Sequence, residues 1–314
     1  MRHIAYSALF LSAVLPLAAQ QTAVHPPDWK QVDAALGRSG QMQPGDVYKF
    51  AMPRKDLKVM KDGVTIAPGL ALGSWAAFKK EGDQTMLMGD LVLTEDEVEP
   101  VMLKLQQEGI EQTALHNHLL GETPHILYMH IGASGDAVKL ASSLAAALAL
   151  TKTPGASTAS AAGTASPVPP TAATGSGAQA IDFDTKAVEE ALGYTGKVNG
   201  GILQFGIPRA ETIKEAGMVV PPAMGTATAI NFQPTESGKA AISGDFVLLA
   251  SEVNPVIHAL RTHGIDVEAV HNHMLMDEPH LYFLHFWAND DAVKLAHGLK
   301  AALNATNSQK PQSR

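Results

Sequence analysis

The chain has 314 residues, of which 46% are hydrophobic and 17% are charged, so it can form about two globular domains with apolar cores. A formal net charge of −8 and the lack of a long Lys/Arg run argue against a nucleic acid as the main partner. The chain has no cysteine, which excludes disulfides and a lipid on an N-terminal cysteine. Any metal site must therefore use His, Asp, Glu or water.

The first segment has the layout of a secretory signal peptide. A short polar start precedes the apolar run Ile4–Leu17, and the small residues Ala18 and Ala19 follow it. An uncleaved membrane anchor is the alternative, but the run is short for a bilayer span and contains Pro16. We therefore expect residues 1–20 to be removed, leaving a soluble periplasmic or extracellular protein without stable membrane insertion.

Residues 25–150 form a first unit in which helices alternate with antiparallel strands. Thr94 followed by Glu97 is a capping box that predicts the start of a helix. The residues around Gly82 favour a hairpin turn between two strands. In chain order, the expected elements are a helix over Asp28–Leu36, strands over Val47–Ala51, Leu72–Lys79 and Thr85–Leu93, a helix from Thr94 to Gln107, strands over Ile110–Leu119 and His125–Ile131, and a helix over Gly135–Leu148.

The same pattern returns 155 residues later, which indicates a tandem duplication. The segment Ala114–Ala141 matches Ala269–Ala296, and the register is expected to hold without a gap from about residue 46 to 141. The second unit is expected over residues 181–303, with Ser251 at the N-cap of its middle helix. Residues 151–180 are rich in Ala, Pro, Ser, Thr and Gly and predict a mobile linker, and residues 304–314 predict a disordered tail.

This order of elements predicts an α+β protein. Two tandem copies of an antiparallel-sheet-plus-helices domain are expected to be related by a pseudo-twofold axis. We also expect the two sheets to merge across that axis.

Each copy carries a dense group of histidines on one hairpin. His116 and His118 are two residues apart on a strand, so both side chains point to one face. If the turn is centred on Gly121 and Glu122, His118 lies opposite His125, and the three imidazoles converge because facing Cβ atoms are about 5 Å apart. His130 has the wrong parity for that face unless a bulge intervenes. The second copy repeats the set as His271, His273, His280 and His285.

These imidazoles predict a divalent transition-metal site in each copy, with zinc as the expected ion. Neutral imidazole is the commonest nitrogen ligand of zinc, and three protein ligands leave one position open for water or substrate. If the metal activates water, Glu122 and Asp277 in the equivalent turns are the candidate general bases. Further candidate site residues are His130, His285, Asp90, Asp245, Arg54 and Arg209.

The pattern leaves several alternatives open. The histidines form either a metal site or a structural hydrogen-bond network, in which Asn117 and Asn272 brace the sheet from its other side. Arg54 and Arg209 follow prolines, and they either bind a carboxylate or phosphate or satisfy backbone carbonyls. The spacing does not decide the oligomeric state or whether the two histidine groups share one centre. Three histidines without counterparts are expected on the surface: His258, His263 and His297.

The doubled pattern HNH-x(5)-PH-x(4)-H resembles the LppY/LpqO family, also called DUF1259. The resemblance covers roughly residues 25–150 and 180–303. Some members of that family are lipoproteins, and this chain lacks the cysteine that such an attachment requires. The resemblance supports the two-domain organisation and implies no reaction, substrate or catalytic residue.

The sequence is therefore consistent with two functions. The first is an exported protein that binds a divalent metal or a small polar ligand at each histidine cluster, with metal-dependent hydrolysis as its enzymatic version. The second is a non-catalytic envelope module that binds a small molecule or an envelope polymer between the copies, with structural histidines.

Overall fold

The computed structural model describes residues 28–154 and 180–310, which form two copies of one α+β domain. The expected signal peptide, most of the linker and the last four residues lie outside the described residues. The first copy contains, in chain order, α1 (Trp29–Leu36), β1 (Gln41–Gln43), β2 (Val47–Pro53), β3 (Val59–Lys61), β4 (Val64–Ile66), α2 (Pro68–Ala71), β5 (Gly73–Glu81), β6 (Gln84–Thr94), α3 (Glu95–Gln107), β7 (Glu111–His116), β8 (Ile126–Gly135) and α4 (Ala137–Leu148).

The second copy repeats the helices and the long strands in the same order, and it differs in the short elements between them. It contains α5 (Thr185–Leu192), β9 (Lys197–Asn199), β10 (Ile202–Pro208), β11 (Lys214–Glu215), β12 (Met218–Val219), the 3₁₀ helix η1 (Pro222–Met224), β13 (Ala227–Pro234), β14 (Lys239–Leu249), α6 (Ala250–Thr262), β15 (Asp266–His271), β16 (Asp277–Glu278), β17 (Leu281–Asp291) and α7 (Ala292–Leu303).

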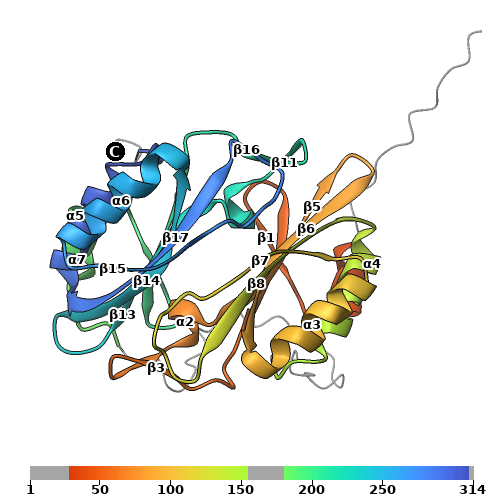
Figure 1. The fold of residues 1–314 in the computed structure, drawn as a ribbon, viewed down its shortest axis with the longest axis horizontal. Helices are drawn as coiled ribbons and strands as arrows, with labels where there is room; N and C mark the ends of the chain where they lie inside the picture. Colours follow the sequence, from red (N-terminus) through yellow and green to blue (C-terminus); the bar gives the residue numbers. More distant parts are fainter. Residues whose placement is uncertain (1–27, 155–179, 311–314) are drawn as a thin grey trace, which may run out of the picture.

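Each copy builds one six-stranded antiparallel sheet, and the two sheets face each other. The strand orders are β1-β2-β5-β6-β8-β7 and β15-β17-β14-β13-β10-β9. Helices α1, α3 and α4 cover the outer face of the first sheet, and α5, α6 and α7 cover that of the second (Figure 1). The inner faces pack together, so the molecule has four layers and the expectation of a merged sheet is wrong.

Apolar side chains fill the space between the helices and each sheet, and two smaller clusters join the sheets. Met88 and Phe283 belong to the first inter-sheet cluster, while Tyr128 and Trp287 belong to the second. Both clusters therefore contain residues from both copies. Burial of apolar surface across this interface favours the face-to-face arrangement, since each sheet would otherwise expose an apolar inner face to water.

A buried glutamate in the first turn caps the middle helix of each copy. In the first copy the Thr94 N–H donates to Glu97 at 3.0 Å, which agrees with the expected capping box. In the second copy the Leu249 N–H donates to Glu252 at 2.8 Å, so the N-cap residue is Leu249 and not Ser251. The carboxylate of Glu252 determines the start of this helix, which is why a leucine is tolerated at the cap.

The repeat is interrupted by two changes of register. Pro53 pairs with Gly73 in the first copy and Pro208 pairs with Ala227 in the second, so β5 aligns with β13 at an offset of 154 rather than 155. The offset returns to 155 at Asp90 and Asp245. The gap-free register expected from the sequence is therefore wrong, because the short elements before β5 and β13 and the loops after them differ in length.

The chain beyond α7 is held against the second copy. The Asn307 N–H donates to Glu252 at 2.7 Å, and the Gln309 N–H donates to the Pro208 carbonyl at 2.8 Å. Residues 304–310 thus differ from the disordered tail expected from their polar composition, because the fold satisfies their backbone groups.

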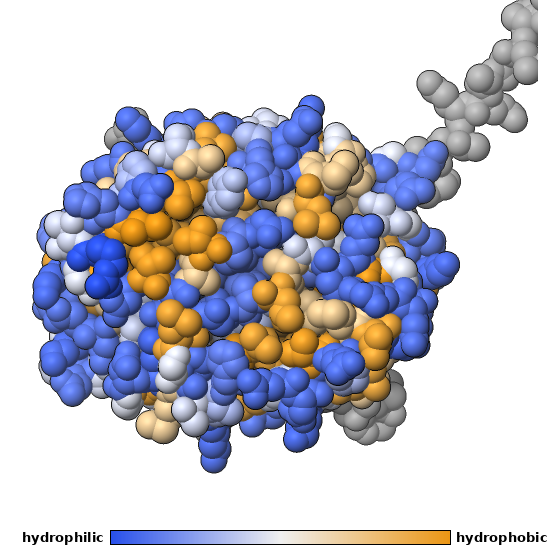
Figure 2. All heavy atoms as spheres, in the orientation of Figure 1, coloured by the Kyte–Doolittle hydropathy of each residue, from blue (hydrophilic) through white to orange (hydrophobic). Residues whose placement is uncertain are grey.

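The surface carries apolar patches among hydrophilic side chains (Figure 2). Within residues 28–154 and 180–310, no helix has both the length and the apolar character needed to cross a bilayer. The segments that carry the paired histidines contain several exposed large apolar side chains, namely Leu115, Leu120, Val270, Leu275 and Met276.

Candidate metal centre

A β-bulge in each copy determines which histidines share a face. In β7 the pairing with β8 shifts by one residue between Gln112 and Ala114, so that His116 faces Tyr128. The same shift occurs in β15 between Val267 and Ala269. A one-residue shift moves side chains to the opposite face of the sheet. The sequence expectation that His118 would lie opposite His125 is therefore wrong.

The bulge turns His116 and His118 toward His130 and away from His125. The side chain of His125 is 44% exposed, and its Nδ1 lies 2.9 Å from Glu122 in the turn. In the second copy His280 is 53% exposed and pairs with Asp277 at 2.7 Å. Neither His125 nor His280 joins the other histidines, whereas His130 and His285 do.

Glu122 and Asp277 hold the turns through backbone hydrogen bonds. Glu122 accepts from the Ile126 N–H at 3.0 Å, and Asp277 accepts from the Leu281 N–H at 2.7 Å. Neither carboxylate belongs to the groups of ligand atoms that converge between the copies. These contacts give both residues a role in fixing the hairpin turn.

Six histidines, three from each copy, meet between the two sheets. Three imidazole pairs stack across the copies with ring centroids 3.6–3.8 Å apart, and each pair joins one residue of each copy. The rings of Tyr128 and Phe283 stack on the outer pairs at 3.4 and 3.3 Å. The stacked pairs are His116 with His271, His118 with His285, and His130 with His273. The two histidine groups therefore form one shared cluster, which the sequence spacing had left open.

Backbone contacts select the imidazole nitrogens that face the cluster. The Nδ1 of His285 lies 2.9 Å from the Gly244 carbonyl, and the Nδ1 of His271 lies 3.0 Å from the Asn272 carbonyl. Because a carbonyl accepts only from a protonated nitrogen, each of these rings keeps its Nε2 lone pair free. Such a backbone bond to the distal nitrogen is how metal-ligating histidines are usually oriented.

Two carboxylates flank the cluster at equivalent positions, and Asp90 is buried whereas the side chain of Asp245 is 15% exposed. The Oδ2 of Asp90 lies 3.5 Å from the Nε2 of His118, and the Oδ2 of Asp245 lies 3.1 Å from the Nε2 of His273. Each aspartate follows a glycine that the neighbouring strand requires. A Cβ on Gly244 would lie 2.0 Å from the Ala229 carbonyl oxygen, so only glycine allows this close approach.

Burial controls protonation throughout the cluster. Desolvation lowers the pKa of five imidazoles well below the ordinary value, and neighbouring histidines lower it further. Desolvation also raises the pKa of Asp90 and Asp245, although nearby histidines act in the opposite direction. The five histidines are therefore neutral at pH 7, the form that binds metal: His116, His118, His130, His273 and His285.

The asparagines between the paired histidines bind the opposite copy. The Asn272 side chain donates to the Thr113 carbonyl at 2.9 Å, and the Asn117 side chain donates to the Glu268 carbonyl at 3.3 Å. Thr113 and Glu268 are the bulge residues, whose carbonyls are free from regular strand pairing. The same bulges that turn the histidines inward thus also provide the acceptors that hold the two copies together.

Three overlapping groups of side chains bring their ligand atoms within 4.8 Å of one another. Ligand atoms at about 2.1 Å from one ion lie within roughly 4.2 Å of each other, so small adjustments would complete a coordination sphere. Only one of the groups has four members and a carboxylate. The groups are Asp245 with His271, His273 and His285; His116 with His118 and His285; and His116 with His130 and His271.

A cavity of about 960 Å³ between the copies reaches this cluster. Its walls run from exposed residues such as Lys55 and Gly69 to the buried Asp90 and His130. The remaining wall is mostly apolar and includes Trp75. The volume is in the range of small-molecule sites, so a ligand can reach the histidines from solvent.

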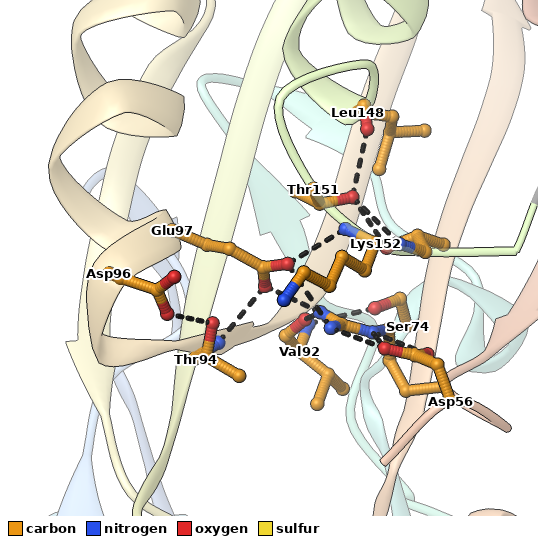
Figure 3. Close-up of polar contacts among 11 residues, drawn as sticks. Asp56, Ser74, Val92, Thr94, Asp96, Glu97, Leu148, Thr151 and Lys152 are labelled. Atoms are coloured by element: carbon orange, nitrogen blue, oxygen red, sulfur yellow. Dashed lines mark hydrogen bonds and ion pairs between the residues drawn. The ribbon is translucent and has the colours of Figure 1, made fainter.

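The two arginines that follow prolines are structural. Arg54 is fully buried and donates to Glu97 and to the Val92 carbonyl, both at 2.7 Å, and to Asp56 at 2.8 Å. Figure 3 shows these acceptors gathered at the start of α3. Arg209 repeats the arrangement with Glu252 and Glu211. All donors of each guanidinium have partners, which leaves none for an external carboxylate or phosphate.

The sequence matches the family described as Domain of Unknown Function (DUF1259) over residues 30–150 and 186–305. The chain belongs to this family. The match to both copies agrees with the duplicated α+β fold described above. The comparison with curated proteins gave no match.

Two solved structures of shell proteins show a distant likeness to the family member described here. A trimeric bacterial microcompartment shell protein, PduB, is 12% identical, with 86% of this chain and 90% of that chain covered and a TM-score of 0.19. EtuB from Clostridium kluyveri is 9% identical, with 84% and 90% covered and a TM-score of 0.19. At these scores the likeness carries no argument about function.

Sequence reasoning missed two further residues of the cavity, Lys49 and Trp75. Both lie on strands of the first copy, and the second copy has Gln204 and Ala229 in their places. A difference between the copies at a strand position that faces inward is the signal that could have found them. The three surface histidines were predicted correctly, since His258, His263 and His297 are all exposed.

Proposed function

We propose that this protein is exported and binds one divalent transition-metal ion per chain in the six-histidine cluster between its copies. The observation that supports this most strongly is a set of nine buried polar atoms in the cluster without a hydrogen-bond partner. They are seven imidazole nitrogens and one oxygen each of Asp90 and Asp245. Each unsatisfied buried atom costs about 1–3 kcal/mol, and a bound cation would satisfy several of them together.

The overlap of the three ligand groups favours a single ion. Any two groups share one histidine, and an imidazole nitrogen gives its lone pair to one metal. We assign the ion to Asp245, His271, His273 and His285, since this group alone combines three imidazoles with a carboxylate. Such a set suits zinc, and it also suits iron, manganese or nickel.

The cavity beside the cluster supports a reactive role for the ion. A metal with an accessible position polarises a bound ligand or lowers the pKa of bound water toward neutrality, which is the basis of hydrolytic metal sites. We propose Asp90 as the base of such a reaction. Its Oδ1 is buried without a partner, and its Oδ2 lies 3.5 Å from His118. Glu122 and Asp277, the bases expected from the sequence, are engaged in the turns.

Elemental analysis of the purified full chain tests the proposal. The protein is stripped with a chelator, loaded separately with zinc, manganese, iron and nickel, and passed through a desalting column. We expect one equivalent of at least one metal in the wild type and in His280→Ala, and almost none in His285→Ala. His280 is the matched control, because it lies in the same hairpin and outside the cluster.

A second variant distinguishes the loss of a metal ligand from a loss of the folded structure. Asp245→Asn preserves the side-chain shape and removes a ligand charge, so it should weaken metal retention while circular dichroism and thermal melting show a folded protein. Retention of a full equivalent by both His285→Ala and Asp245→Asn would contradict the assignment.

The cavity favours a second candidate, a non-catalytic envelope module that binds a small or polymeric ligand between the copies. In that case the three stacked imidazole pairs serve only as packing. The same experiment separates the candidates. A wild type that retains no metal, and whose thermal stability does not respond to chelator or to added metal, supports the second candidate.

A further inference from the structure

The pseudo-twofold symmetry of the cavity is broken by a lysine. Lys49 on β2 lines the cavity, and Gln204 occupies the equivalent position on β10. Each of these side chains crosses to a short helix of the other copy. The Lys49 ammonium donates to the Ala223 carbonyl at 2.8 Å, and the Gln204 amide donates to the Gly69 carbonyl at 3.0 Å. The two residues thus make equivalent structural contacts, and only Lys49 adds a positive charge.

The charge of Lys49 is not neutralised by an ion pair. Lys49 is mostly buried and lies over the ring of Trp75 at 4.2 Å. The negative charge of Asp90 acts on it from a distance, and no carboxylate of the described residues forms an ion pair with it. The Ala223 carbonyl takes one of its three N–H donors. A largely buried ammonium with two free donors beside a cavity is an unfavourable arrangement unless an anion completes it.

The surrounding wall indicates what kind of anion fits. Away from the histidines the cavity is lined mainly by apolar side chains, among them Met52, Leu70 and Trp75. A hydrated inorganic anion would leave this wall unused, whereas an organic anion would bury its apolar part there. Two aspartates, Asp90 and Asp245, also line the cavity and would repel an anion unless a metal cation neutralises them.

We propose that the cavity binds a small organic carboxylate, with its charged group between Lys49 and the metal centre and its apolar part against Trp75. The inference rests on the proposed metal site, since the cation offsets the two aspartates. The proposal places the ligand against the first copy, because the second copy lacks both the ammonium of Lys49 and the indole of Trp75. The two copies are related by pseudo-twofold symmetry, but the ligand contacts Lys49 and Trp75 of the first copy alone.

Benzoate and its neutral analogue benzamide test the proposal as probes of similar shape. Binding of each is measured by isothermal titration calorimetry to the metal-loaded full chain, to the chelated full chain and to metal-loaded Lys49→Gln. Metal content is determined on the same samples. Lys49→Gln retains the contact to Ala223 that Gln204 makes in the other copy, so the variant is expected to fold and to retain its metal.

Hydrogen bonds to a charged group contribute about 1.5–3 kcal/mol, which corresponds to a change in affinity of about tenfold or more. We expect metal-loaded wild type to bind benzoate at least about tenfold more tightly than benzamide, and Lys49→Gln to lose this preference while its weak affinity for benzamide stays the same. Chelation should also weaken benzoate binding.

The proposal is overturned if benzoate fails to bind at millimolar concentration, if benzamide binds equally well, or if Lys49→Gln binds benzoate like the wild type. When any of these results comes from samples with one equivalent of metal, the proposed metal site stands and only the carboxylate inference fails. A wild type that cannot be loaded with metal would instead contradict the proposed function itself.

Discussion

The buried neutral histidines should make the metal-free protein sensitive to mild acid. Five imidazoles have a pKa far below the value of about 6.5 that they regain on unfolding, so the unfolded state takes up more protons below pH 6.5. The stability that these groups provide is therefore complete above pH 6.5 and is lost as the pH falls. Between pH 6.5 and 5.5 the loss is about 1 kcal/mol for each imidazole, or about 5 kcal/mol in total.

The two aspartates beside the cluster act in the opposite direction. The pKa of Asp90 and of Asp245 is raised in the folded state, so protonation on acidification favours folding and offsets at most about 1.4 kcal/mol each over the same range. The net loss is then at least about 2 kcal/mol, a substantial part of the 5–15 kcal/mol that typical domains possess. Bound metal should reduce the loss near pH 6.5, because it stabilises the neutral imidazoles.

Urea unfolding in chelator at pH 7.0, 6.5, 6.0 and 5.5 measures this dependence. The slope of the unfolding free energy against pH gives the number of protons taken up, and His130→Asn should reduce it by about one. His125→Asn is the control and should leave the slope unchanged, since His125 lies in the exposed turn. An unfolding free energy that stays constant from pH 6.5 to 5.5 in chelator would refute the reasoning.

Three further substitutions test the parts of the fold that position the cluster. Gly244→Ala should lower stability by about 1–3 kcal/mol in thermal melts, because its Cβ would lie 2.0 Å from a carbonyl oxygen, whereas Gly206→Ala, with open space around it, should have little effect. Equal melting temperatures for these two variants would contradict the close approach. Asn272→Ala should cost about 1–3 kcal/mol in urea unfolding because it leaves the carbonyl of a bulge residue in the other copy unpaired, and a neutral result would argue against the contact between the copies. Arg54→Met should destabilise the protein by about 3–5 kcal/mol while its metal content stays at one equivalent, and loss of metal from a folded Arg54→Met protein would show that the arginine serves the site after all.

The periodic and repeated features of the sequence predicted most of the fold. The duplication is visible because both copies must build the same sheet and helices, and the capping box at Thr94 marks the start of α3 because local backbone chemistry determines it. The short elements β3, β4 and η1 were not predicted, since segments of three residues carry no periodicity.

The sequence predicted that histidines gather at the candidate site, but it did not predict correctly which histidines lie together. His116, His118, His271 and His273 were placed correctly on one face, but His125 and His280 were chosen in place of His130 and His285. The cause is a single bulge residue in each copy, which a sequence pattern of period two does not reveal. Sequence spacing also gave no sign that the two groups stack on each other, because contacts across the copies depend on how the sheets pack.

Anomalous X-ray scattering from crystals of the metal-loaded protein tests the central claim most directly. Data collected on either side of the absorption edge of the loaded metal locate the ion without any assumption about its ligands. The expected result is one peak per chain, about 2.1 Å from a carboxylate oxygen of Asp245 and from nitrogens of His271, His273 and His285. A peak in the turns at His125 or His280, or no peak between the two sheets, would contradict a shared metal centre between the two copies.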